Sequence, residues 1–124
     1  MKDPTSPVCR TISTLLARIG DKWTVLVVKT LGEGSKRFNE LRREIPSVSQ
    51  RMLTLTLRNL ERDGIVSRAV TPSIPPRVDY ALTDLGYSLL TPIMALSEWA
   101  LDNIEAIHEA QARFDAQSEE RAAA

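Results

Sequence analysis

The residues best suited to chemistry lie between Ser49 and Thr83, where arginines and hydrogen-bonding side chains occur at helical spacing. Arg51 and Arg58 are seven positions apart, which places them on one face of a helix. A guanidinium group can donate two hydrogen bonds to guanine O6 and N7, and a glutamine amide such as that of Gln50 matches adenine N6 and N7. Hydroxyl groups bind phosphates or base edges. The pattern predicts contact with DNA through Ser49, Gln50, Arg51, Thr54 and Arg58.

Arg77 provides a sixth candidate contact, on a predicted hairpin that directly follows this helix. Residues 65–71 and 77–83 have strand patterns, and three prolines stiffen the loop between them. A hairpin in this position is expected to act as a wing, with Arg77 at the minor groove or at phosphate. Two alternatives stay open. In the first, Arg77 pairs with Asp79 on its own strand instead of contacting DNA. In the second, the helix arginines form a solvated face, on which Arg58 or Arg62 pairs with Glu61 or Asp63.

The net charge of zero conceals a strong segregation of charge along the chain. Residues 36–77 hold nine Lys or Arg and four Asp or Glu, whereas residues 78–124 hold two Lys or Arg and nine Asp or Glu. The middle of the chain is therefore a cationic surface, and the C-terminal third is an anionic one that would avoid a phosphate backbone.

The apolar periodicity predicts a mainly α fold with one small β-hairpin, of the α+β class. Helices are expected over 11–19, from Asp21 to about residue 31, over 38–45 after a short extended segment at 36–38, and from Ser49 to Gly64. Leu53, Leu57 and Leu60 form the buried face of the last of these. Thr83 caps a long helix in which Pro92 predicts a kink or a break, and a final helix precedes a frayed end.

Several motifs then resemble those of the HxlR family of winged-helix transcription regulators, which are related to the MarR group. They are GDKW at 20–23, RFNELRREI at 37–45, SQRML at 49–53, LRNLERDGIVSR at 57–68, PPRVDYALTDLG at 75–86 and EW at 98–99. The resemblance implies a homodimer held by the first and C-terminal helices, with a recognition helix in the major groove. Many members have Cys-Pro-Val near the start, whereas this chain reads Ser6-Pro-Val-Cys9. Redox sensing therefore does not transfer directly to Cys9.

Other classes of function find little support in the sequence. Cys9 and His108 are the only cysteine and histidine, so no nucleophile–base pair, metal site or cofactor site is expected, and Cys9 is either a small apolar residue or a thiol sensor. An aromatic effector pocket at Trp23 and Trp99 is a further alternative. The first residues lack the pattern of a secretory signal and no apolar run could span a bilayer, so a cytoplasmic location is expected.

These observations together predict a single winged-helix domain over residues 1–124. Within it we expect N-terminal helices at 10–34, a helix-turn-helix and wing at 35–83, dimerisation helices at 84–117, and a flexible tail at 118–124. The predicted function is a homodimeric, sequence-specific transcription regulator on a pseudo-palindromic operator, responsive to a small-molecule or redox signal. The alternative is a winged-helix module for protein–protein contact without DNA binding.

Overall fold

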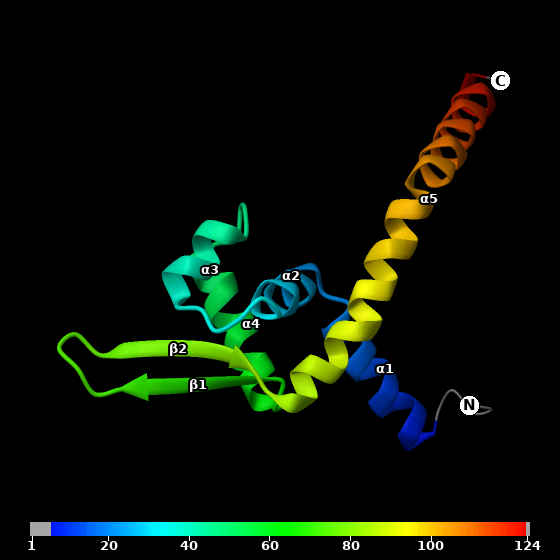
Figure 1. The fold of residues 1–124 in the computed structure, drawn as a ribbon. Coiled ribbons are helices and arrows are strands. Elements are labelled where there is room, and N and C mark those ends of the chain that lie inside the picture. The colour runs from blue at the N-terminus through cyan, green and yellow to red at the C-terminus, as the bar shows by residue number, and fades with distance from the viewer. Residues whose placement is uncertain (1–5, 124) are drawn as a thin grey trace. The chain divides into compact units, whose positions relative to one another are not determined.

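The computed structural model describes residues 6–123, and these form five helices and one two-stranded antiparallel sheet (Figure 1). In chain order the elements are α1 (Pro7–Ile19), α2 (Lys22–Leu31), α3 (Phe38–Glu44), α4 (Gln50–Arg62), β1 (Val66–Thr71), β2 (Arg77–Leu82) and α5 (Asp84–Ala123). The predicted class, mainly α with a small hairpin, is confirmed. The contacts divide the chain into two units, one ending at Thr91 and the other beginning at Pro92.

The core of the first unit is built around α2. Val27, Val28 and Leu31 are fully buried, as expected for a helix with almost no polar face. Asp21 caps this helix by accepting hydrogen bonds from the backbone N–H groups of Trp23 and Thr24. The buried leucines of α3 and α4 pack toward α2, so the helix-turn-helix is held against the N-terminal helices.

The first helix begins earlier than its apolar pattern suggests. The pattern predicts a start at residue 11, but α1 begins at Pro7. The Ser6 hydroxyl accepts a hydrogen bond from the Cys9 backbone N–H at 3.1 Å. Proline suits the first helical position because its fixed φ is helical and no N–H is needed there. Cap chemistry, rather than periodicity, sets this boundary.

Two short signals set the ends of α4 and the wing. Gly64 has φ +77°, the left-handed conformation expected of a residue that ends a helix. The hydroxyl of Thr83 accepts from the Gly86 N–H at 3.1 Å, so Thr83 caps α5 as predicted. The short strand expected at 36–38 is reduced to one bridge, in which Lys36 pairs with Tyr80 at the outer edge of β2.

The C-terminal region differs from the prediction of two helices and a tail. A single helix, α5, continues through Ala123, with Pro92 inside it; Ala124 lies outside the described residues. Proline removes one backbone hydrogen bond, and beyond it the sequence contains neither glycine nor proline and is rich in alanine and glutamate. Helix propensity therefore carries the helix across the positions where Pro92 and the polar end suggested boundaries.

Candidate nucleic-acid interface

The candidate interface begins at the first turn of α4. The Ser49 hydroxyl accepts a hydrogen bond from the Met52 N–H at 3.0 Å, which makes Ser49 the N-cap. Its oxygen is thus used within the protein, while its own hydrogen can still be donated outward. Ser49 is exposed, so it combines a structural role with the predicted DNA contact.

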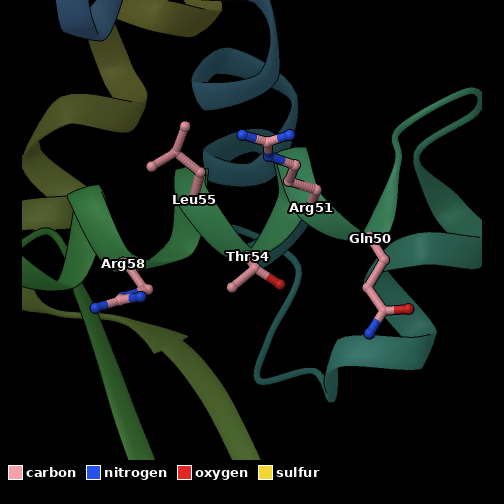
Figure 2. Close-up of a pocket in the computed structure, with 5 residues that line it drawn as sticks. All are labelled: Gln50, Arg51, Thr54, Leu55 and Arg58. Carbon is pink, nitrogen blue, oxygen red and sulfur yellow. The ribbon is translucent and has the colours of Figure 1, made fainter.

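The two faces of α4 separate as the helical spacing predicts. Leu53, Leu57 and Leu60 are buried together with Thr56. The opposite face is exposed and presents Gln50, Arg51, Thr54, Leu55 and Arg58, which line a shallow surface pocket of about 560 Å³ (Figure 2). All five belong to one helix, so they form an open surface rather than an enclosed cavity. Such a surface fits a large, complementary partner better than a small molecule.

Within the described part of the chain, the arginines of this face have no acidic partner. Among residues 6–123, no carboxylate lies within 4.0 Å of the guanidinium groups of Arg51 and Arg58. Asp63 instead pairs with Arg18, so the alternative in which Asp63 neutralises Arg58 or Arg62 is not what the structure shows. Two uncompensated guanidinium groups on a solvent-facing helix can bind guanine edges or phosphates at little desolvation cost.

Arg77 occupies a different position from the residues of α4. Its Nε donates to Asp79 Oδ2 at 3.0 Å, so the predicted alternative of an ion pair along the strand is present. The Arg77 side chain remains about half exposed. It lines a pocket of about 480 Å³ with the α3 residues Asn39, Glu40 and Arg43 and with Arg37. Arg77 therefore belongs to the surface between α3 and the wing, and the pair with Asp79 fixes its direction.

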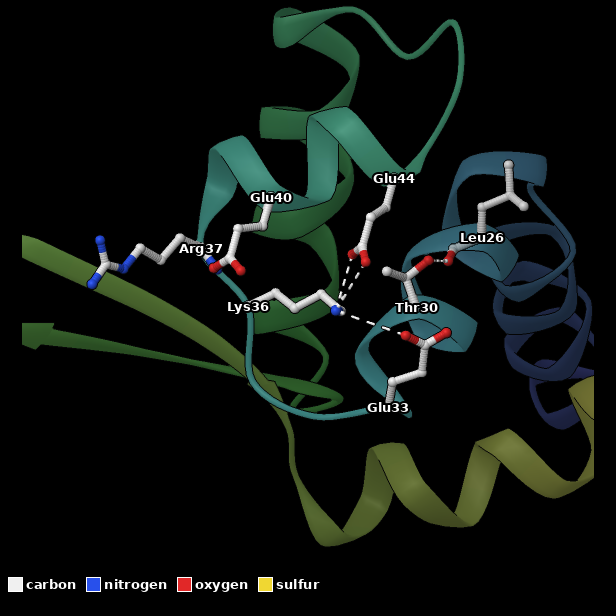
Figure 3. Close-up of polar contacts among 7 residues, drawn as sticks. All are labelled: Leu26, Thr30, Glu33, Lys36, Arg37, Glu40 and Glu44. Atoms are coloured by element: carbon white, nitrogen blue, oxygen red, sulfur yellow. Dashed lines mark hydrogen bonds and ion pairs between the residues drawn. The ribbon is translucent and has the colours of Figure 1, made fainter.

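Lys36 is a polar residue whose role the charge pattern alone does not reveal. Its Nζ lies 3.0 Å from Glu44 Oε2 and 3.7 Å from Glu33 Oε2 (Figure 3). The hydrogen bond to Glu44, with the nearby charges of Glu33 and Glu40, raises the pKa of Lys36 above its usual value. Lys36 therefore joins the end of α3 to the loop after α2, and we regard it as structural.

The ion pair between Arg18 and Asp63 also escapes prediction from the sequence. Arg18 lies on α1 and Asp63 ends α4, 45 positions later. Nothing in the local spacing connects them, because only the packing of α1 near the end of α4 brings them together. This ion pair therefore places Arg18 of α1 at the C-terminal end of α4, the helix that carries the candidate site.

The described part of the chain holds neither a cluster of metal ligands nor a membrane-spanning helix. Within residues 6–123, no three His, Cys, Asp or Glu side chains gather as metal ligands. None of the helices of that segment is both long enough and apolar enough to pass through a bilayer. Cys9 is buried.

A helix-turn-helix formed by α3 and α4 and followed directly by a hairpin defines the winged-helix class of proteins. Residues 18–108 match the model of the HxlR-like helix-turn-helix family. The chain belongs to this family of transcriptional regulators.

Individual relatives agree with this assignment. The chain is 42% identical over 106 residues to the HTH-type transcriptional regulator YdeP of Bacillus subtilis, covering 81% of this chain and 83% of YdeP. Among solved structures, it resembles the transcriptional regulator ytfH from Salmonella typhimurium at a TM-score of 0.76 and 32% identity, over 89% of this chain and 95% of ytfH. It also resembles the reduced form of the redox regulator HypR at a TM-score of 0.74 and 42% identity, over 80% of this chain and 98% of HypR. Neighbours described as MarR-family regulators are found as well. These proteins are regulators rather than enzymes, which agrees with the prediction that this chain is not an enzyme.

Proposed function

We propose that this protein binds duplex operator DNA in a sequence-specific manner and regulates transcription there. The observation that carries the proposal is the exposed face of α4, where Arg51 and Arg58 lie free of carboxylates beside Gln50 and Thr54. In helix-turn-helix proteins the second helix enters the major groove, and its N-terminal residues contact base edges. Gln50 and Arg51 occupy that position in α4. Ser49, Thr54 and Arg77 supply further contacts to phosphates or base edges.

The proposal includes a homodimer on a pseudo-palindromic operator, with half-sites about 34–36 Å apart or a multiple of that spacing. Two helices support it through large apolar side chains left exposed. On α1 these include Val8 and Leu16, and on α5 Leu96, Trp99 and Leu101. Exposed apolar groups of this size mark interaction surfaces, and a second copy is the occupant that the family resemblance implies. The acidic residues of α5 would be repelled by DNA phosphates, so this helix suits dimerisation better than DNA contact.

We further propose that a chemical signal, either a small molecule or a redox change, alters DNA binding by changing the separation or tilt of the two recognition helices. A redox signal would act through Cys9, the one cysteine of the sequence. The resemblance to a redox regulator supports this route, and the burial of Cys9 opposes a rapid direct reaction. Working on the chromosome, the protein would act in the cytoplasm.

The decisive experiment is a fluorescence-anisotropy titration of the purified protein with duplexes from the region upstream of its own gene and of the neighbouring genes. Operator binding should be tighter than binding to a scrambled duplex of equal length. The affinity should also fall steeply with salt, because each neutralised phosphate contributes about −0.9 to the slope of log K against log salt concentration. Absence of salt-dependent binding to every duplex would favour the alternative, a module that contacts only proteins.

A further inference from the structure

A second pocket, separate from the α3 side of the wing, lies between α4 and the hairpin. It has a volume of about 360 Å³ and is lined by Thr54, Leu57, Arg58, Glu61, Arg68 and Tyr80. In Figure 2 the Arg58 side chain extends from α4 toward the strands, whereas Arg51 extends to the other side of the helix. Arg58 is thus shared between the exposed face of α4 and this second pocket, which we call the wing-base cleft.

The register of the hairpin explains why Arg68 and Tyr80 face α4. The two residues are direct partners across the antiparallel strands, so their side chains lie on the same face of the sheet. Two positions along, Val66 and Leu82 are also partners, and both are buried. Because side chains alternate in a strand, the face that carries Arg68 is the one that packs at Val66 against the body of the protein. Arg68 therefore lies two residues beyond the buried Val66, on the same face of the strand.

The charge of the wing-base cleft suits a single anion. Arg58 and Arg68 are both exposed, and no carboxylate lies within 4.0 Å of either guanidinium in residues 6–123. Glu61 is the one acidic residue in the lining, so the cleft retains a net positive charge of one. The phenolic hydroxyl of Tyr80 adds a neutral donor. Guanidinium groups that line one cleft from a helix and from a strand can each donate hydrogen bonds to phosphate oxygens.

The position of Arg58 along α4 distinguishes a phosphate contact from a base contact. Arg58 lies seven residues beyond Arg51, a rise of about 10 Å along the helix axis. Base edges are reached mainly from the N-terminal part of a recognition helix, whereas the region beside the wing meets the DNA backbone. We propose that the wing-base cleft binds one backbone phosphate of the duplex through Arg58 and Arg68. The inference rests on the proposed DNA binding, and it assigns Arg58 to affinity rather than to sequence choice.

The test compares salt-dependent binding of Arg68→Gln, Arg58→Gln and the control Arg113→Gln, which removes a charge from α5. Titrations use the operator duplex and a scrambled duplex at several salt concentrations. Arg68→Gln and Arg58→Gln should each weaken binding to both duplexes by the same factor and reduce the size of the salt slope by about 0.9. Arg68→Lys should retain the slope, and Glu61→Gln should tighten binding to both duplexes. Arg113→Gln should change nothing.

The possible failures are distinguishable. If the wild type binds the operator with a salt slope but Arg68→Gln keeps the full slope, the wing-base cleft holds no phosphate. If Arg58→Gln lowers operator affinity while sparing the scrambled duplex, Arg58 reads a base and the inference is wrong. If the wild type shows no salt-dependent binding to any duplex, the proposed function itself fails, and the inference fails with it. Far-ultraviolet circular dichroism and thermal unfolding of each variant exclude loss of folding as the cause.

Discussion

Arg18 donates hydrogen bonds from a single nitrogen, Nη1, to both carboxylate oxygens of Asp63, at 2.6 and 2.8 Å. The contact joins the first helix to the residue that ends α4, and both side chains are largely shielded, with 30% and 16% of their surface exposed. Arg10 and Arg62 line the same surface pocket as Arg18. Asp63 therefore pairs with one of the three arginines that line this surface near the end of α4.

Removal of either partner should lower the free energy of unfolding. We expect a loss of about 1–2 kcal/mol for Arg18→Gln, because the pair is only partly buried. Asp63→Asn should cost more than Arg18→Gln, since it leaves Arg18 unneutralised beside Arg62. The double variant should be more stable than the sum of the two losses implies. Urea unfolding followed by circular dichroism measures all three, and strict additivity would show that the pair contributes nothing.

Arg51 is predicted to select the operator sequence. Arg51→Ala should reduce operator affinity by about 1–3 kcal/mol while changing binding to a scrambled duplex much less, because a bidentate contact to guanine is lost. Arg51→Lys should restore binding to the scrambled duplex but only part of the preference, since an ammonium group lacks the planar fork of arginine. Paired anisotropy titrations on the two duplexes measure the ratio. An equal loss on both duplexes would assign Arg51 to the backbone instead.

The parts of the fold that were predictable from the sequence are those set by local chemistry. Leu53, Leu57 and Leu60 recur at helical spacing, so the buried face of α4 and the exposed position of Arg51 follow from the sequence alone. Gly64 and Thr83 mark boundaries because the conformations they favour are specific to a helix end and a cap.

The features that were not predictable depend on contacts between distant segments or on competing local preferences. The Arg18–Asp63 pair joins residues 45 positions apart. The wing-base cleft brings Arg58 together with Arg68 and Tyr80, 10 and 22 positions later, and no spacing rule encodes either arrangement. The continuous α5 reflects helix propensity that outweighs Pro92. For Arg77 the spacing allowed both a DNA contact and a pair with Asp79; the pair is present, and the DNA contact stays a prediction.

Lys36 is expected to make folding stability depend on alkaline pH. Its folded pKa is raised above the ordinary value of 10.5, first by the hydrogen bond to Glu44. The resulting stabilisation is complete below the ordinary pKa and is lost as pH rises through the higher folded pKa. The stability difference between wild type and Lys36→Gln should therefore be constant near neutral pH and shrink above about pH 10.5. Urea unfolding of both proteins across this range measures the difference. The contribution of tyrosine titration to stability is common to both proteins, so it drops out of that difference. A difference that persists unchanged at high pH would contradict the assignment.

Cys9 should react slowly with thiol reagents in the native protein. Only 7% of its surface is exposed, and reaction requires both access and a thiolate. A chromogenic disulfide reagent should modify it much faster in urea than in buffer, and an oxidant should release little DNA from either the wild type or Cys9→Ser. The same oxidant titration on wild type and variant provides the control. Rapid native modification, together with oxidant release that Cys9→Ser abolishes, would instead identify Cys9 as the sensor.

The dimer should depend on exposed apolar side chains of α1 and α5. Leu16 and Trp99 are 61% and 59% exposed, so Leu16→Glu and Trp99→Glu should each weaken self-association by placing a charge in an interface that excludes water. Ile74, on the wing loop and fully exposed, is the matched control: Ile74→Glu should leave the association constant unchanged. Sedimentation-equilibrium measurements over a range of concentrations give that constant directly. The Tm of the wild type should also rise with concentration, because only the folded chain dimerises. A wild type that sediments as a monomer at every concentration, or α1 and α5 variants that associate as tightly as Ile74→Glu, would place the interface elsewhere or remove it.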